Sequence, residues 1–209
     1  MTATSGLRHR SDLHLSRKIW HISSMSLIAW LNHVLPHDMA RMLVLVIGGL
    51  FLVGDSLRLV WPGLNRLIVK YFGEIMRTHE VSRWAGTTWF IAALVLLLVC
   101  FEQATATCAL LMIAFVDPLA SLAGVTLGKH KLSNQKSWEG FVAAIVTGMA
   151  VLAGCVYLQL WRPESVLIAM AATALGVALV ELYTPAWLDD NLTIPLAAAL
   201  CLSQFPGVN

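Results

Sequence analysis

Carboxylates stand inside or beside the apolar segments of this 209-residue chain. Asp117 lies deep in one apolar run, Glu181 ends a second run, and Asp189 and Asp190 begin a third. Ionisable side chains are costly in segments that cross a membrane, and where they occur they usually serve a function. Mg²⁺ prefers one or two carboxylates together with substrate phosphates. These acidic groups therefore indicate a site for a hard divalent cation.

Basic residues that suit phosphate oxygens accompany these acids. They are Arg17, Lys18, Lys129, Lys131 and Lys136. Ser137 is a good N-cap, so the free backbone N–H groups of a helix that begins there would face the same loop. Phosphoryl transfer needs little beyond positioning and charge neutralisation. Acids, bases and a helix N-terminus together favour the binding of a Mg²⁺–nucleotide.

Most of these residues also have a purely structural interpretation. Asp55 and Arg58, one helical turn apart, fit a packing ion pair better than a catalytic pair. The Gly124–Gly128 spacing is typical of close helix packing, and it is not a Walker A loop. His21 could be a structural histidine. The remaining candidates could set topology or begin a helix: Lys129, Lys131, Asp189, Asp190 and the segment 136–140.

The composition of the chain predicts a membrane protein. Hydrophobic residues make up 58% of the chain and charged residues 12%, and the mean hydropathy is +0.73. Soluble domains usually carry about 25% charged residues. These values exclude a disordered chain, a nucleic-acid-binding arm and an ordinary soluble enzyme. They predict a single all-α integral membrane domain over residues 1–209, with the lipid bilayer and no nucleic acid as its partner.

Hydropathy and helix breakers predict seven transmembrane helices. The expected spans are 18–35, 40–60, 84–101, 103–127, 138–161, 164–183 and 191–205. Residues 1–16 form a basic N-terminal segment, and residues 62–83 have the pattern of an amphipathic helix in the membrane interface. Pro118 and the small residues after it are expected to break the fourth span, since irregular backbone is tolerated where it lines a cavity.

The positive charges indicate the orientation in the membrane. With seven spans, twelve of the 14 Lys and Arg residues fall on one side, and Arg41 and Arg162 alone fall on the other. The side with more positive charge is normally the cytoplasmic side. The N-terminus and the candidate site are therefore expected in the cytoplasm, and the C-terminus on the opposite side.

Five segments of the chain, taken in order, form a recognisable pattern. They are Arg17-Lys18-Ile19-Trp20-His21; Asp55 to Arg58; Glu80 to Gly86, which contains Arg83; Asp117-Pro118-Leu119-Ala120 with Gly124, Gly128 and Lys136-Ser137-Trp138-Glu139-Gly140; and Asp189-Asp190-Asn191-Leu192 with Ile194-Pro195. Together they resemble the CTP-dependent lipid kinases, which comprise dolichol kinase, phytol kinase and the yeast-type diacylglycerol kinase and are related to phosphatidate cytidylyltransferase. The match covers about residues 15–200. Eukaryotic dolichol kinases carry many more spans, so the chain resembles the compact prokaryotic members.

The resemblance implies a Mg²⁺-dependent kinase at the cytoplasmic face. It would transfer the γ-phosphoryl group of CTP to the hydroxyl of a membrane lipid alcohol of the polyprenol (dolichol), phytol or diacylglycerol type. An alternative is a phosphatidate cytidylyltransferase that makes CDP-diacylglycerol, because both reactions need Mg²⁺, acids and bases. The residues alone also allow a small membrane transporter with a polar pathway. A homodimer stays open.

The resemblance also implies the roles of individual residues. The catalytic residues would be Asp117, Asp189, Asp190 and Lys136. The metal ligands would be Asp117, Glu139, Asp189 and Asp190. The nucleotide-binding residues would be Arg17, Lys18, His21, Gly124, Gly128, Lys129, Lys136, Ser137, Glu139 and Gly140. The supporting residues would be Asp55, Arg58, Glu80, Arg83, Glu181 and Asn191.

Overall fold

The computed structural model describes residues 15–132, 136–185 and 187–207, which form eight α-helices and one short 3₁₀ helix. In chain order these are α1 (Leu15–Val34), α2 (His37–Val60), α3 (Pro62–Phe72), η1 (Thr78–Val81), α4 (Gly86–Cys100), α5 (Gln103–Thr126), α6 (Trp138–Tyr157), α7 (Val166–Tyr183) and α8 (Asp190–Ser203). The described residues contain no β-strand, which confirms the all-α prediction. The predicted basic segment 1–16 lies almost entirely outside the described residues.

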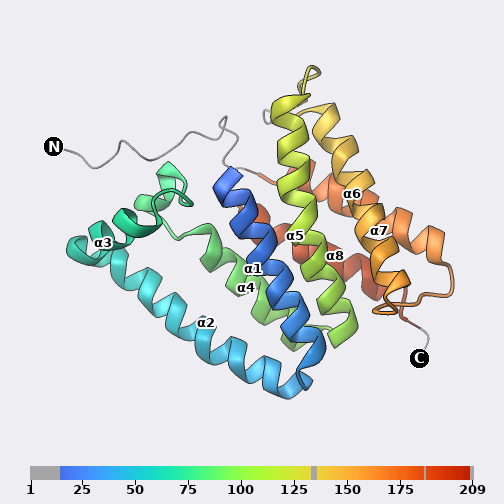
Figure 1. Ribbon diagram of the computed structural model, residues 1–209, viewed down its shortest axis with the longest axis horizontal. Coiled ribbons are helices and arrows are strands. Elements are labelled where there is room, and N and C mark those ends of the chain that lie inside the picture. The colour runs from blue at the N-terminus through green and yellow to red at the C-terminus, as the bar shows by residue number, and fades with distance from the viewer. Residues whose placement is uncertain (1–14, 133–135, 186, 208–209) are drawn as a thin grey trace.

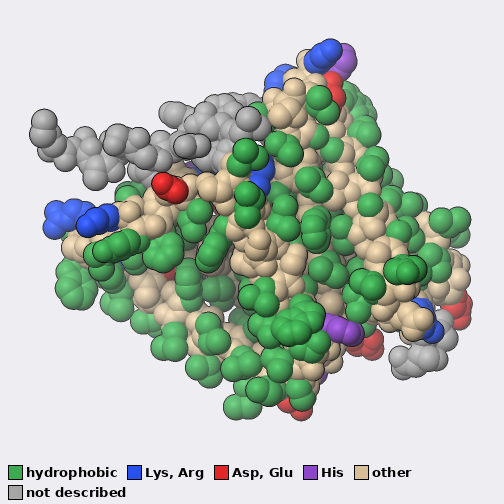
Figure 2. Space-filling view, viewed as in Figure 1, with side chains coloured by type: hydrophobic (Ala, Val, Ile, Leu, Met, Phe, Trp, Pro, Cys, Tyr) green, Lys and Arg blue, Asp and Glu red, His purple; other side chains and the backbone are tan. Residues whose placement is uncertain are grey.

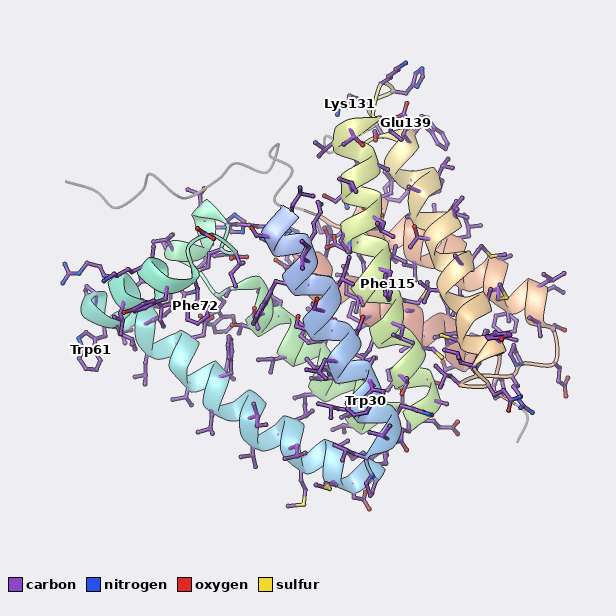
Figure 3. All side chains as sticks on the ribbon, in the orientation of Figure 1. Trp30, Trp61, Phe72, Phe115, Lys131 and Glu139 are labelled. Carbon is purple, nitrogen blue, oxygen red and sulfur yellow. The ribbon has the colours of Figure 1, made fainter. Side chains whose placement is uncertain are left out.

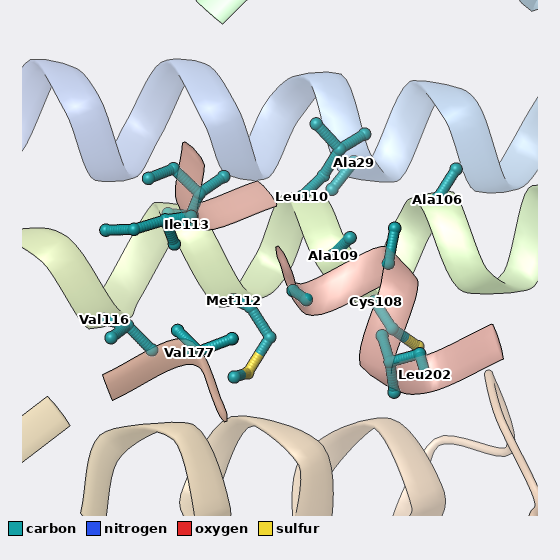
Figure 4. Close-up of a cluster of buried hydrophobic side chains, with 14 of the residues drawn as sticks. Ala29, Ala106, Cys108, Ala109, Leu110, Met112, Ile113, Val116, Val177 and Leu202 are labelled. Carbon is teal, nitrogen blue, oxygen red and sulfur yellow. The ribbon is translucent and has the colours of Figure 1, made fainter. Parts of the chain in front are cut away.

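Helix α5 is the centre of the bundle. It packs against α1, α6 and α8, while α4 packs against both α8 and α2 (Figure 1). Alanines such as Ala106 and Ala109 are fully buried along α5 and let its neighbours approach closely. Figure 4 shows Ala29 of α1 on one side of α5, with Val177 of α7 and Leu202 of α8 on the other. The core therefore surrounds the helix that carries Asp117.

Helices α1 and α5 run antiparallel. Near one end of the pair, the Asn32 side-chain amide donates a hydrogen bond to Thr107 Oγ1 over 2.9 Å. Near the other end, His21 Nε2 lies 3.0 Å from the carbonyl oxygen of Ile113. Because of this arrangement, the first turns of α1 lie beside the last turns of α5. The fold thereby brings the N-terminal basic pair of α1 to the end of α5 that follows Asp117.

Within the described part of the chain, four helices are long and apolar enough to cross a membrane, namely α2, α5, α6 and α7. Helices α4 and α8 are apolar but shorter. Met42 and Leu50 of α2 are 68% and 70% exposed, and hydrophobic side chains cover much of the visible face (Figure 2). Such apolar surface suits contact with lipid. The seven predicted spans correspond to α1, α2, α4, α5, α6, α7 and α8, but seven crossings are not confirmed.

Two local features differ from the sequence prediction. The amphipathic helix expected within residues 62–83 is present as α3, but it ends at Phe72, and turns and η1 follow it. Trp61 and Phe72 flank α3 in Figure 3. At Gly73 an added Cβ would meet a backbone oxygen of α3 at 2.5 Å, so the chain leaves the helix where only glycine fits.

The second correction concerns Pro118, which does not break α5. The helix continues from Gln103 through the proline to Thr126. A proline inside a helix removes one backbone hydrogen bond and strains the preceding turn. Most helical stability in a folded protein comes from tertiary packing. The packing of α5 against α1, α6 and α8 therefore outweighs the local cost of the proline.

Candidate active site

A cavity of about 690 Å³ opens among α1, α5, α6, α7, the start of α8 and the connector between α3 and α4. Its charged lining residues are Arg17, Lys18, His21, Arg77, Asp117, Lys131, Lys136, Glu181 and Asp190. Its other lining residues include Ser121, Gly124, Ser137, Gly140 and Phe141. The fold thus gathers both kinds of charge that the sequence indicated for a Mg²⁺–nucleotide site. They come from segments far apart in the chain.

One wall of the cavity is cationic. Lys18 reaches across to α5, where its ammonium donates a hydrogen bond to Ser121 Oγ over 2.8 Å. Arg17 Nη1 is buried and lies 3.8 Å from Glu80 Oε1. Arg77 approaches from the connector, and its Nη1 lies 3.3 Å from Asp189 Oδ2.

Arg77 keeps its positive charge in this site. Burial, the largest influence, would lower the pKa of its guanidinium. The carboxylates of Asp189, Asp117 and Glu80 act the other way and raise that pKa above its usual value. Arg77 is therefore a permanent cation at the cavity wall.

Asp117 lies among basic side chains from three segments of the chain. Its Oδ2 lies 4.0 Å from His21 Nε2, and it also interacts electrostatically with Arg77, Arg17 and Lys136. His21 Nε2 lies within hydrogen-bonding distance of the Ile113 carbonyl, so the ring nitrogen that faces Asp117 also contacts the backbone of α5. Asp117 is thus compensated by side chains of the kind that bind phosphate.

Lys136 connects the carboxylates on the far side of the cavity. Its ammonium donates to the backbone carbonyl of Glu181 and lies 3.3 Å from Glu181 Oε1 and 3.6 Å from Asp190 Oδ2. The three side chains are only 17%, 10% and 11% exposed, in that order. One cation from the α5–α6 loop therefore ties the end of α7 to the start of α8.

Ser137 begins α6 as predicted from the sequence. Its hydroxyl accepts a hydrogen bond from the backbone N–H of Gly140 over 3.1 Å. An added Cβ at Gly124 would lie 3.3 Å from Ser137 Oγ, and one at Gly140 would lie 3.1 Å from the Ala120 carbonyl oxygen. At Gly128 an added Cβ would lie 2.8 Å from Ser137 Oγ. These glycines let α5 and α6 meet closely beside the cavity.

Several residues implied by the resemblance do not line the cavity. Glu139 lies at the outer end of α6 with Lys131 nearby (Figure 3), and its Oε1 is 2.8 Å from His130 Nδ1. Gly128 and Lys129 are also absent from the cavity lining. Asp189 caps α8 by accepting hydrogen bonds from the backbone and side chain of Asn191.

Four of the supporting residues, Asp55, Arg58, Glu80 and Arg83, belong to a separate hydrogen-bond network around the connector, whereas Glu181 lines the cavity and Asn191 binds Asp189. Asp55 Oδ1 pairs with Arg58, while Asp55 Oδ2 accepts hydrogen bonds from the Ala85 N–H and the Thr88 hydroxyl. Arg58 in turn donates to the carbonyl of Arg83 over 2.8 Å. The packing ion pair expected from the sequence is present. Its hydrogen bonds go to the backbone of the connector at Arg83 and Ala85.

Sequence reasoning missed Arg77 as a site residue. It was counted only among the positive charges that set topology. The available signal was its position three residues before Glu80, whose Oε2 accepts a hydrogen bond from the Arg77 backbone N–H over 2.9 Å. No helical or strand period marks this connector, so nothing in the sequence says which way the side chain points.

The carboxylates fit a cation that arrives with its phosphates. Among the described residues there is no cluster of three or more His, Cys, Asp or Glu side chains suited to hold a metal ion. Asp117 and Asp190 nevertheless both face the cavity. One or two carboxylates plus substrate phosphates are the ordinary ligand set of Mg²⁺.

The fold is that of a helical membrane protein with a cavity lined by both acidic and basic side chains. Among curated proteins, the CTP-dependent diacylglycerol kinase 1 of Schizosaccharomyces pombe is 30% identical over 161 residues, covering 71% of this chain and 73% of the relative. That of Eremothecium gossypii is 29% identical over 206 residues, covering 88% of this chain but only 64% of the relative. The phytol kinase of Synechocystis is 24% identical over 196 residues, covering 91% of this chain and 78% of the relative.

The chain belongs to the family of CTP-dependent lipid kinases. This confirms the resemblance drawn from the five sequence segments. No family model and no solved structure matches the chain.

Proposed function

We propose that the chain is a CTP-dependent kinase that phosphorylates the hydroxyl of a membrane lipid alcohol in the cavity at Asp117. The observation that carries the proposal is the cavity itself, where cations from three separate segments surround Asp117 in a chain of this family. Nothing in the geometry selects CTP over another nucleotide, so the donor rests on the relatives. Diacylglycerol is the first acceptor to test, because two relatives are named as diacylglycerol kinases.

The reaction joins the lipid hydroxyl oxygen to the γ-phosphorus of CTP and breaks the bond between that phosphorus and the β–γ bridging oxygen. CDP leaves with the bonding electrons, and the hydroxyl proton passes to a cavity carboxylate, Asp117 or Asp190. Arg17, Lys18 and Lys136 hold the phosphate oxygens and offset their charge. When bound, Mg²⁺ would be held by the one of these two carboxylates that does not take the proton, together with the phosphates, and would neutralise charge on them.

Membrane geometry supports the same site. The cavity lies at the end of the bundle where α1 begins and α5 ends, on the side that carries most of the Lys and Arg residues. By the positive-inside rule this face would be the cytoplasmic one, where CTP would be available. A lipid alcohol would reach it from the bilayer with its chains against the apolar helices.

The test uses the full chain in detergent with Mg²⁺, γ-³²P-CTP and diacylglycerol, phytol or a polyprenol. Label on a lipid supports the proposal, and the lipid that takes it identifies the acceptor. Asp117→Asn should reduce turnover about 10²–10⁴-fold, the usual contribution of a side chain that accepts the proton in the transition state. Asp38→Asn is the matched control, because that carboxylate is 95% exposed and lies at the opposite end of the bundle.

A parallel reaction with phosphatidate separates the alternative chemistry. Labelled pyrophosphate together with CDP-diacylglycerol would identify a cytidylyltransferase and overturn the proposal. Turnover with Asp117→Asn equal to the wild type would reject the site even if the activity is present.

A further inference from the structure

Arg77 enters the cavity from a segment that lies outside the five motifs of the sequence. It belongs to the connector between α3 and α4, yet it lines the same cavity as Arg17, Asp117 and Lys136. A guanidinium presents five N–H donors in a planar fork that matches phosphate oxygens. Arg77 thus brings the donor geometry of a phosphate ligand to the nucleotide site.

The connector is held in place along its length. Glu80 accepts hydrogen bonds from the backbone N–H groups of Arg77 and Gly86, over 2.9 and 3.1 Å. Asn65 of α3 donates to the Val81 carbonyl over 2.9 Å. A loop fixed at these points presents Arg77 in one position, as a preorganised ligand requires.

Asp189 orients the guanidinium of Arg77. Asp189 Oδ2 lies 3.3 Å from Arg77 Nη1, while Asp189 Oδ1 accepts two hydrogen bonds from Asn191. One carboxylate therefore ties Arg77 to the start of α8. Because one Asp189 oxygen is anchored by Asn191 and the other contacts Arg77, Asp189 is suited to position the Arg77 side chain.

Two guanidinium groups, those of Arg17 and Arg77, share this wall of the cavity. Arg17 and Arg77 repel each other electrostatically, and Arg17 Nη1 is buried without a hydrogen-bond partner among the described residues. A buried donor on a charged group is costly when it has no acceptor. Phosphate oxygens between the two side chains would accept these hydrogen bonds and relieve the repulsion.

We propose that Arg77 binds phosphate oxygens of the nucleotide together with Arg17, and that Asp189 is the positioning residue for Arg77. The inference rests on the proposed function for the identity of the anion, which would be the triphosphate of CTP. Arg77 would act on the phosphate chain and leave the lipid acceptor untouched.

The test measures binding separately from turnover. Titration calorimetry on the full chain in detergent gives dissociation constants for Mg²⁺–CTP and for inorganic tripolyphosphate. Arg77→Gln should weaken both about 10–100-fold, the effect of losing charge-assisted hydrogen bonds. The dissociation constants of Arg77→Lys should lie between those of the wild type and Arg77→Gln, because lysine keeps the positive charge but lacks the planar set of N–H donors. Arg66→Gln, on the exposed face of α3, is the control and should bind like the wild type.

Further variants separate a phosphate ligand from a structural residue. Asp189→Asn should weaken binding of both anions, and the effect of Arg77→Gln should be smaller in that background, since the two act as a unit. In turnover, Arg77→Gln should raise the KM for CTP and leave the KM for the lipid unchanged. Equal dissociation constants for Arg77→Gln, Arg77→Lys and the wild type would overturn the inference while the proposed function stands. Binding of tripolyphosphate that depends on Arg77, in a chain that turns over no CTP, would support the anion site and reject the proposed function.

Discussion

Replacing Lys136 with alanine should separate the stability of the cavity from its chemistry. The Lys136 ammonium lies 3.3 Å from Glu181 Oε1 and 3.6 Å from Asp190 Oδ2. Lys136→Ala would leave two nearly buried carboxylates facing each other without a cation. Removing one partner of a buried ion pair costs about 3–5 kcal/mol. Because the lysine is 17% exposed, we expect the lower end, about 3 kcal/mol.

The assay for stability is thermal unfolding in detergent. For a chain of this length each kcal/mol shifts the melting temperature by about 2–4 °C, so Lys136→Ala should melt about 6–12 °C lower than the wild type. Adding Glu181→Gln removes one of the two stranded charges, and the double variant should regain about half of that loss. Lys70→Ala, an exposed lysine on α3, should melt like the wild type.

Turnover should behave differently from stability. If Lys136 holds phosphate oxygens, both the single and the double variant should lose about 10²–10³-fold in kcat/KM for CTP. Recovery of activity by Glu181→Gln in parallel with the melting temperature would mean that Lys136 acts only through the fold. An unchanged melting temperature for Lys136→Ala would refute the view that Lys136 stabilises the fold by pairing with Glu181 and Asp190.

Three further predictions test the packing, the outer carboxylate and the cation. Gly140→Ala should lower both the melting temperature and the affinity for CTP, because its Cβ would lie 3.1 Å from the Ala120 carbonyl oxygen. Gly49→Ala meets nothing within 4 Å and should stabilise α2 by about 0.5–1 kcal/mol in the same unfolding assay. Glu139→Gln should reduce turnover less than about fivefold, because Glu139 is outside the cavity lining and its partner His130 is 75% exposed, and ion pairs at the surface contribute little. A loss of about a hundredfold would place Glu139 on the nucleotide. EDTA should abolish phosphorylation of the lipid and leave the melting temperature without nucleotide unchanged, and turnover that survives chelation would contradict a role for Mg²⁺.

The helices could be predicted because the apolar runs are separated by clear breakers. Pro36, Pro163 and Pro185 lie between helices in the structure, and Pro62 is the first residue of α3. Pro118 was treated by the same rule and was misread, because its helix is packed on several sides and the local rule ignores tertiary support. Local breakers therefore mark a boundary reliably only where no packing opposes them.

The sequence predicted which charged residues gather at the site, but it did not predict which of their side chains point into the cavity. Arg17, Asp117 and Asp190 were grouped from their position at one end of the predicted spans, and they do line one cavity. Glu139 was grouped with Ser137, yet two residues along a helix of 3.6 residues per turn point to nearly opposite sides. Asp190 lines the cavity and Asp189 does not, for a similar reason. Asp189 is the N-cap that precedes α8, and Asp190 is the first residue of that helix.

The segments Asp55 to Arg58 and Glu80 to Gly86 have a role that needs no contact with substrate. The Asp55–Arg58 pair holds the backbone of Ala85 and Arg83, and Glu80 holds the backbone of Arg77. These hydrogen bonds fix the connector from both ends. A charge pair that is buried among apolar helices is poor evidence for stability and better evidence for a specified geometry. The geometry specified here is the direction of one guanidinium into the cavity, so loss of the Asp55–Arg58 pair should weaken CTP binding through Arg77 rather than through any group of its own.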